Sequence, residues 1–149
     1  MADIGRLTAE HNIIGLDTSV FIYHFESHPR YLELTTAVLD NVEAGRQQAV
    51  ISTVLLMELT VYPWRRVQPQ MARRYEALLV NFPNLRMVNV TRATARQAAK
   101  LRAEFNVRPA DALHVATALV HGATAFVTND KQLKRLAPLI VPIVLEDFA

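Results

Sequence analysis

Five short apolar segments recur along the chain, and segments with helical character lie between them. Strands that alternate with helices form βαβ units, in which the strands run parallel and helices cover both faces of the sheet. The alternation therefore predicts an α/β fold with a mostly parallel sheet. We expect strands at residues 11–17, 49–52, 85–90, 123–128 and 140–145. Pro142, inside the last of them, indicates an edge strand.

Capping residues and prolines set the expected bounds of the helices. Thr18 or Ser19 is expected to cap the first helix, and Pro109 to open the last long one. Pro63 is expected to end its helix, because proline lacks the N–H that a helix interior uses. The expected helices cover residues 19–25, 29–43, 53–62, 68–80, 92–105, 109–121 and 131–137.

Length and composition limit the class of protein. The 149 residues suit one domain, which we assign to residues 1–149, and a hydrophobic fraction of 51% supports a core. The lack of cysteine excludes a disulfide framework and a thiolate metal site. No apolar run approaches the roughly 20 residues of a membrane span. Residues 1–10 carry charges instead of the apolar stretch of a secretory signal, so we expect a cytoplasmic protein with no membrane partner. These ten residues form an N-terminal extension whose flexibility the sequence leaves open.

Charge is distributed unevenly along the chain. Residues 1–64 contain three Lys or Arg and eight Asp or Glu, whereas residues 65–108 contain ten and two. Arg92, Arg96 and Lys100 are spaced at i, i+4 and i+8, so they form one basic stripe on a helix. Such a stripe fits a phosphate backbone, and it equally fits a solvated helical face.

Four acidic residues carry the chemical interpretation. Asp17 and Asp130 follow apolar strands, Asp111 lies in the first turn of a helix, and Glu58 is embedded among leucines. In open α/β sheets, ligands bind at the carboxyl ends of the strands, so the four could meet in one crevice. Each also has a plainer interpretation. Asp17 can cap a helix, Asp111 can favour a helix N-terminus, Asp130 can belong to a turn, and Glu58 can face solvent.

Clustered carboxylates need a compensating charge. Like charges a few ångströms apart repel each other and raise one another's pKa. Mg²⁺ or Mn²⁺ removes that conflict, because both ions prefer carboxylate and water oxygens. A divalent ion in such a site can activate water and polarise a phosphoryl oxygen. The four acids therefore favour metal-assisted phosphoryl chemistry.

Four motifs together resemble the PIN domain family, over about residues 13–145. They are the stretch DTSVFIYHFE at residues 17–26, Glu58, the stretch PADALH at residues 109–114, and TND at residues 128–130. The resemblance implies a three-layer α/β/α fold with a five-stranded sheet of order 3-2-1-4-5. It also implies a metal-dependent ribonuclease, and many prokaryotic members are VapC-type toxins of toxin–antitoxin pairs.

The resemblance assigns roles to individual residues. Ser19 and Thr128 match the family's small hydroxyl positions beside the acids, where they orient carboxylates or a water molecule. The implied reaction is in-line attack of water on a phosphodiester, which leaves 5′-phosphate and 3′-hydroxyl ends. The stretches at residues 26–31 and 62–65 resemble a subgroup whose members need not be toxins. The catalytic residues and metal ligands implied are Asp17, Glu58, Asp111 and Asp130.

Two residues in or next to the third motif, residues 109–114, have open roles. His114 lies one turn after Asp111, so it is either a partner of that carboxylate or an ordinary helix histidine. Arg108 either meets the scissile phosphate or is a surface arginine. We expect RNA to contact Arg108, Arg92, Arg96 and Lys100.

Three functions remain open from the sequence. The favoured one is a Mg²⁺- or Mn²⁺-dependent endoribonuclease, with an antitoxin partner and a homodimer left open. The second is a PIN-like module that binds RNA or protein without cutting. The third is an aspartyl-phosphate phosphohydrolase with Asp17 as nucleophile, but that chemistry wants an acid two residues later, where this chain has Ser19.

Overall fold

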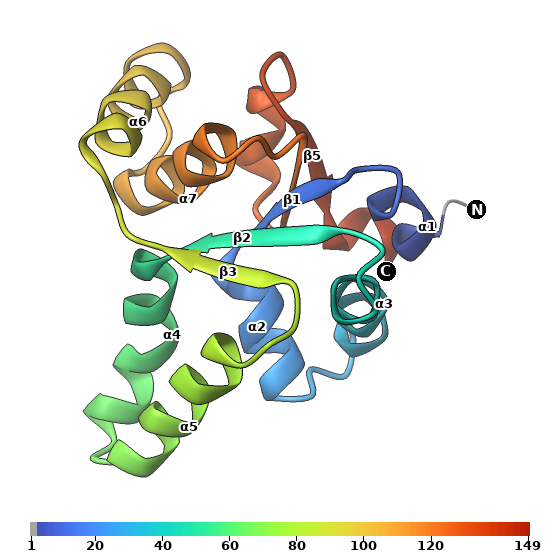
Figure 1. Ribbon diagram of the computed structural model, residues 1–149, viewed down its shortest axis with the longest axis vertical. Helices are drawn as coiled ribbons and strands as arrows, with labels where there is room; N and C mark the ends of the chain where they lie inside the picture. Colours follow the sequence, from blue (N-terminus) through green and yellow to red (C-terminus); the bar gives the residue numbers. More distant parts are fainter. Residues whose placement is uncertain (1–2) are drawn as a thin grey trace.

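The computed structural model describes residues 3–149, which form a five-stranded parallel sheet covered by helices on both faces (Figure 1). The sheet order is β3-β2-β1-β4-β5, and every neighbouring pair is parallel. The expected fold and strand order are confirmed, and Pro142 lies in the edge strand β5. The strands are β1 (Ile13–Leu16), β2 (Gln48–Ser52), β3 (Leu85–Val88), β4 (Ala125–Thr128) and β5 (Val141–Val144).

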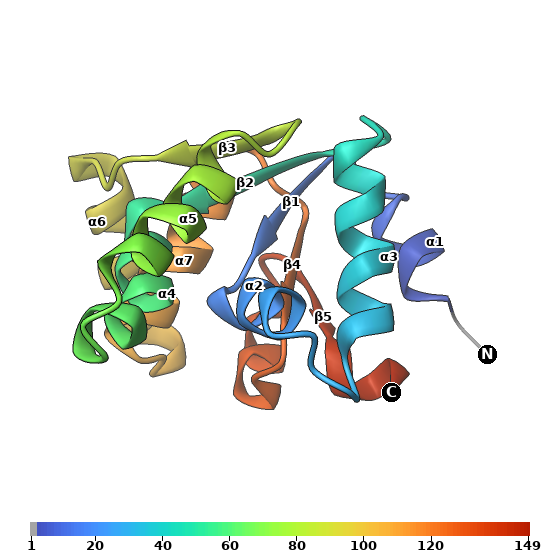
Figure 2. The ribbon, with the colours of Figure 1, turned by 90° about the horizontal axis from the view of Figure 1, so that it is seen from below.

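Helices α6 and α7 cover one face of the sheet, and α2, α4 and α5 lie on the other (Figure 1). Helices α1 and α3 pack together beside the sheet, close to the end of the chain (Figure 2). No helix within residues 3–149 has the length and apolar character needed to cross a membrane. The bounds are α1 (Ile4–Thr8), α2 (Thr18–Phe25), α3 (Leu32–Glu43), α4 (Thr53–Arg65), α5 (Pro69–Val80), α6 (Arg92–Phe105) and α7 (Pro109–Val120), with 3₁₀ helices η1 (Lys131–Leu136) and η2 (Leu145–Phe148).

Alternate residues of the strands feed two apolar clusters, one on each face. In β1, Ile14 and Leu16 join the cluster that includes residues of α2, α3 and α4. Gly15 points to the opposite face, where α7 packs against the sheet. A Cβ atom on Gly15 would lie only 2.6 Å from Cβ of Ala118, so glycine permits this close approach. The contact fixes α7 beside β1, which brings the start of α7 near the end of that strand.

Three expected helix bounds are wrong. Helix α3 begins at Leu32 instead of residue 29, because residues 29–31 form a turn before it. Helix α4 runs through Pro63 to Arg65, because the proline removes only its own N–H. The turn beyond it is kept by a backbone hydrogen bond from Arg66 to the carbonyl of Tyr62, at 3.1 Å. The cap of α2 is Asp17 instead of Thr18 or Ser19, since its carboxylate accepts from the first backbone N–H of the helix.

Residues 4–8 form the short helix α1, which contacts α3. Ile4 is buried in the apolar cluster on that side of the sheet. The side chain of Asn41 donates to the carbonyl of Gly5 at 2.6 Å, and that of Gln47 donates to the carbonyl of Thr8 at 2.6 Å. These contacts hold residues 4–8 against α3 and the segment that precedes β2.

Candidate active site

Asp17 lies at the carboxyl end of β1, between β1 and β4, where the strand order changes direction. Its Oδ1 accepts from the backbone N–H of Thr18 at 2.7 Å, and its Oδ2 accepts from Oγ1 of Thr128 at 2.6 Å. Only 9% of Asp17 is exposed. Burial raises the pKa of this carboxyl, although both hydrogen bonds and the nearby His114 act in the opposite direction. A buried carboxylate of this kind is stabilised by a neighbouring cation.

Asp130 follows β4 and begins η1. Its Oδ1 accepts from the backbone N–H of Gln132 at 2.9 Å, which is ordinary capping. Its backbone N–H donates to Oγ1 of Thr128 at 3.0 Å, so one buried hydroxyl contacts both acidic residues. The other oxygen, Oδ2, faces Arg108.

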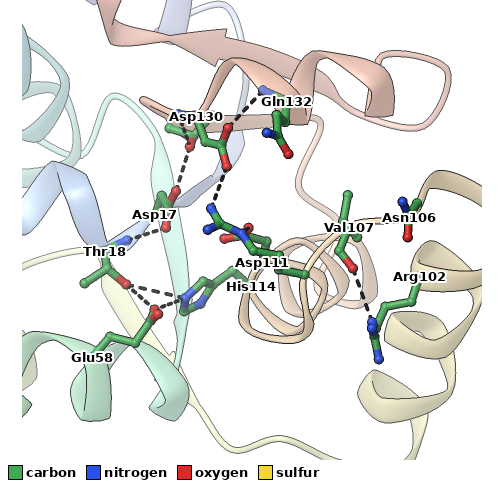
Figure 3. Close-up of polar contacts among 12 residues, drawn as sticks. Asp17, Thr18, Glu58, Arg102, Asn106, Val107, Asp111, His114, Asp130 and Gln132 are labelled. Carbon is green, nitrogen blue, oxygen red and sulfur yellow. Dashed lines mark hydrogen bonds and ion pairs between the residues drawn. The ribbon is translucent and has the colours of Figure 1, made fainter.

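Asp111 lies in the first turn of α7 and faces the same region (Figure 3). Burial raises its pKa, and the charge of Arg108 partly offsets this, while Asp130 adds a like charge. The Arg108 guanidinium donates to Oδ2 of Asp111 at 3.2 Å and to Oδ2 of Asp130 at 3.0 Å. The arginine side chain is 75% exposed, so these ion pairs are at the surface and are weak by nature.

Glu58 lies apart from this group, paired with His114 and Thr18 (Figure 3). Its Oε1 accepts from Oγ1 of Thr18 at 2.7 Å and makes a short contact with Nε2 of His114. The hydrogen bond from His114 lowers the pKa of Glu58, against the effect of its partial burial. Burial also opposes a charged His114, but the hydrogen bond to Glu58 and the charge of Asp17 leave its pKa raised. His114 therefore contacts Glu58, not the Asp111 carboxylate that its sequence position suggested.

Three of the four expected acids line one pocket of about 330 Å³, which we call the acidic pocket. Ser19 also lines it, and its Oγ is buried with no hydrogen-bond partner among the described residues. A buried hydroxyl without a partner costs free energy unless a ligand or water satisfies it. The lining residues are Asp17, Ser19, Tyr23, Arg108, Asp111, Asn129, Asp130 and Lys131.

The donor set of the acidic pocket fits a hard divalent cation. Three carboxylates and a free hydroxyl are oxygen donors of the kind that Mg²⁺ and Mn²⁺ prefer. Arg108 already supplies positive charge to two of the carboxylates. Within residues 3–149, however, no three Asp, Glu or His side chains are grouped closely enough to hold an ion as they stand. Arg108 engages Oδ2 of both Asp111 and Asp130 in this arrangement, so it competes with an ion for these two oxygens.

The basic stripe lies on the exposed side of α6. Arg92, Arg96 and Lys100 are all exposed, and Thr91 caps the helix with its side chain. None of these three basic side chains is among the described residues that line the acidic pocket. The stripe is therefore a separate surface on the helix that packs against α7.

Sequence reasoning assigned no role in this region to Thr18, Tyr23, Asn129 or Lys131, and Lys131 lines the acidic pocket. Thr18 donates to Glu58, while Tyr23 and Asn129 line the acidic pocket and are joined by a 3.2 Å hydrogen bond. Asn129 sits between Thr128 and Asp130, so its place in the motif was a usable signal. Thr18 and Tyr23 lie one and six residues after Asp17, but only the helix direction shows which side they face.

In proteins with a three-layer α/β/α fold and an open parallel sheet, ligands bind beyond the carboxyl ends of the strands, where the strand order reverses. In this chain the strand order reverses between β1 and β4, and the acidic pocket lies there. A family model described as PIN domain matches residues 14–139. The chain therefore belongs to the PIN domain family.

Several solved structures share this fold. VapBC2 from Rickettsia felis, bound to a DNA fragment from its promoter, is 20% identical, with a TM-score of 0.67 over 87% of this chain and 96% of that one. A toxin–antitoxin complex from Klebsiella pneumoniae is 22% identical, with a TM-score of 0.63 over 89% and 97%. DNA-bound VapBC from Salmonella typhimurium is 22% identical, with a TM-score of 0.62 over 90% and 98%. A search of curated protein sequences finds no match to this chain.

Proposed function

We propose that this protein is a metal-dependent endoribonuclease whose active site is the acidic pocket. The observation that carries the proposal is the meeting of Asp17, Asp111 and Asp130 in one pocket at the carboxyl edge of the sheet. These residues come from three separate parts of the chain, and membership of the PIN family gives their meeting a catalytic context. The proposal covers residues 1–149 as a single domain.

Asp17, Asp111 and Asp130 would hold Mg²⁺ or Mn²⁺, and Glu58, which pairs with His114 in this structure, is the fourth proposed ligand. A divalent cation supplies a Lewis acid that polarises a phosphoryl oxygen and lowers the pKa of a water. Thr128 holds one oxygen of Asp17 and leaves the carboxylate's remaining electron pairs for the cation. The hydroxyl of Ser19, which has no partner among the described residues, would orient a water or a carboxylate in the pocket.

The basic residues of the proposal bind the RNA backbone. Arg108 stands at the pocket with an exposed guanidinium, so it can transfer from the carboxylates to a phosphate once the cation neutralises the acids. Lys131 also lines the pocket and carries an exposed positive charge. Arg92, Arg96 and Lys100 would contact phosphates further along the strand.

A cleavage assay tests the proposal directly. Single-stranded RNA is incubated with the protein and Mn²⁺, with EDTA, and with Asp17→Asn. We expect cleavage that EDTA and Asp17→Asn both abolish, with 5′-phosphate and 3′-hydroxyl ends. The variant should keep the fold, because removal of a buried charge relieves the desolvation that raises the pKa of Asp17. A folded Asp17→Asn that cuts at the wild-type rate would remove Asp17 from the mechanism.

A second candidate is a module that binds RNA or protein without cutting. The contacts of the acids favour it, since Arg108 pairs with Asp111 and Asp130 and His114 pairs with Glu58. In this case Mn²⁺ would not raise the melting temperature, whereas an ion that binds only the folded state must raise it. RNA binding without cleavage in the assay above would support the module.

An antitoxin partner extends the first proposal. The similar structures include complexes described as VapBC and as toxin–antitoxin, and their likeness to this chain is in the fold. If the chain acts as such a toxin in the cytoplasm, its induced expression should arrest bacterial growth, and Asp17→Asn should not. Gel filtration would report whether it forms the homodimer that the family resemblance allows. Growth unaffected by an active nuclease would remove the toxin part of the proposal alone.

A further inference from the structure

Three aromatic rings gather where α2 turns into α3. Tyr23 stacks on Tyr31 with ring centroids 4.6 Å apart and an interplanar angle of 27°. His28, in the connection between the two helices, lies 4.9 Å from the Tyr23 ring and 4.8 Å from the Tyr31 ring. All three are only partly buried, so the cluster reaches the surface. We call Tyr23, His28 and Tyr31 the aromatic shelf.

The shelf is tied to the acidic pocket by Tyr23. This residue lines the pocket together with Asp17, and Asn129 donates from its side chain to the Tyr23 hydroxyl at 3.2 Å. The other amide atom of Asn129, Oδ1, accepts from the backbone N–H of Glu146 at 2.9 Å. The side-chain amide of Asn129, the residue between Thr128 and Asp130, thus joins the shelf to the segment after β5.

The far side of the shelf is anchored as well. Glu146, just after β5, accepts from the hydroxyl of Tyr31 at 2.6 Å. It also accepts two hydrogen bonds from Arg30, at 3.0 and 2.7 Å. The α2–α3 connection therefore passes beside the end of β5 and the chain terminus (Figure 2). These contacts hold the rings in a fixed position relative to the acids.

We propose that the aromatic shelf binds an unpaired nucleobase of RNA by stacking, next to the phosphodiester that the acidic pocket cuts. The inference rests on the proposed ribonuclease function and assigns one nucleotide-binding subsite of that function to the α2–α3 connection. Aromatic rings stack on any base, because every base has a π face. A base inside a duplex is already stacked on its neighbours, so the shelf selects unpaired nucleotides.

A purely structural role for the rings makes a different prediction. If they only joined α2 to α3, loss of His28 would change stability and leave RNA recognition alone. His28 sits in a surface connection where Ser27 adopts a φ of +52°, and its backbone N–H bonds to the carbonyl of Tyr23 at 2.8 Å. That backbone contact does not need the imidazole, but Nδ1 of the ring accepts from the backbone N–H of Arg30 at 3.1 Å. His28→Ala therefore removes a turn contact together with the ring, so its RNA binding is compared with that of Tyr31→Leu, which leaves this turn contact in place.

The experiment measures RNA binding in the Asp17→Asn background, which prevents cleavage. The probe is a fluorescein-labelled single-stranded RNA of about 12 nucleotides, within the range bound by single-strand proteins. A set of copies carries one abasic position moved along the strand. We expect one abasic position to weaken binding about tenfold, and His28→Ala to weaken binding of the intact RNA by about the same factor. In His28→Ala, the abasic and intact RNAs should bind alike.

Matched variants separate the effect of losing an aromatic ring from the effect of losing stability. Tyr31→Phe keeps the ring stacked on Tyr23 and loses only the hydroxyl contact with Glu146, so it should bind RNA far more tightly than Tyr31→Leu, which should bind like His28→Ala. His121→Ala removes a distant histidine and should have no effect. If His28→Ala, Tyr31→Leu and the parent bind RNA equally, and all three melt normally, the proposal that the aromatic shelf binds a base would be overturned. A wild-type protein that cuts RNA would then still support the ribonuclease, whereas one that neither cuts nor binds RNA would overturn both proposals.

Discussion

The Oγ1 atom of Thr128 lies 2.6 Å from Oδ2 of Asp17, although 111 positions separate the two residues in the chain. The same hydroxyl accepts a hydrogen bond from the backbone N–H of Asp130. Both contacts are possible because β1 and β4 are parallel neighbours, so that their carboxyl ends lie side by side. A single buried hydroxyl therefore sets the relation between two acids of the pocket.

Thr128→Val should destabilise the protein and weaken cation binding. Valine has a similar shape but leaves a buried carboxylate oxygen without its donor, which costs about 1–3 kcal/mol of unfolding free energy. The pKa of Asp17 should rise further, because Thr128 lowers it in the wild type. Urea unfolding and Mn²⁺ titration calorimetry measure the two effects. Thr117→Val, which removes only a bond to the helix carbonyl of Leu113, should lose less stability and no Mn²⁺ affinity.

Arg108→Ala should bind Mn²⁺ more tightly and cleave RNA more slowly. Its guanidinium competes with the cation for Asp111 and Asp130, and exposed pairs of this kind contribute up to about 1 kcal/mol, or about fivefold in affinity. The same change removes a contact for the phosphate. Calorimetry and single-turnover cleavage measure the two effects, with Arg96→Ala as a control that keeps wild-type Mn²⁺ affinity. Weaker Mn²⁺ binding by Arg108→Ala would show that the arginine does not compete.

Glu146→Gln should lower the melting temperature in a way that depends on pH. Hydrogen bonds from Arg30 and Tyr31 lower the pKa of Glu146 from 4.5 to about 2. A carboxyl whose pKa is lower in the folded state contributes stability above its unfolded pKa and loses it as pH falls through the folded value. The melting-temperature difference from wild type should therefore be full above pH 4.5 and shrink toward pH 2. The exposed Glu104→Gln should show no such trend, and a difference for Glu146→Gln that stays constant with pH would contradict the ion pair.

Gly15→Ala should destabilise the fold strongly. The added Cβ would lie 2.6 Å from Cβ of Ala118 and 2.8 Å from Cδ1 of Phe126, both in the packed interior. Overpacking of this kind costs about 1–3 kcal/mol, or more where the backbone must shift. Gly5→Ala is the matched control, because its Cβ meets nothing closer than 3.4 Å and alanine favours the helix α1. Denaturant unfolding should separate the two variants, and equal stability would contradict the close approach of α7 to β1.

The fold could be predicted because local signals and the strand pattern agreed. Short apolar segments separated by capped helices allow few arrangements other than a parallel α/β sheet. Proline was less informative. Pro142 correctly marked an edge strand, whereas α4 continues through Pro63, since packing of a largely apolar helix outweighs the loss of one backbone hydrogen bond.

Only the site residues that directly follow a strand could be placed from the sequence. Asp17 and Asp130 follow adjacent parallel strands, so topology alone brings them together. The hydrogen-bond partner of His114 could not be predicted from topology in this way. Spacing along α7 suggested Asp111, but the imidazole is buried against Glu58 of another helix. Contacts between helices depend on packing that no local pattern in the sequence records.

The most direct test of the proposed metal site is an anomalous diffraction map at the manganese edge from crystals soaked in Mn²⁺. We predict a peak in the acidic pocket among the carboxylates of Asp17, Asp111 and Asp130, with the Arg108 guanidinium moved away from the two acids it contacts. A map with no peak there, and with Arg108 still bridging Asp111 and Asp130, would contradict it.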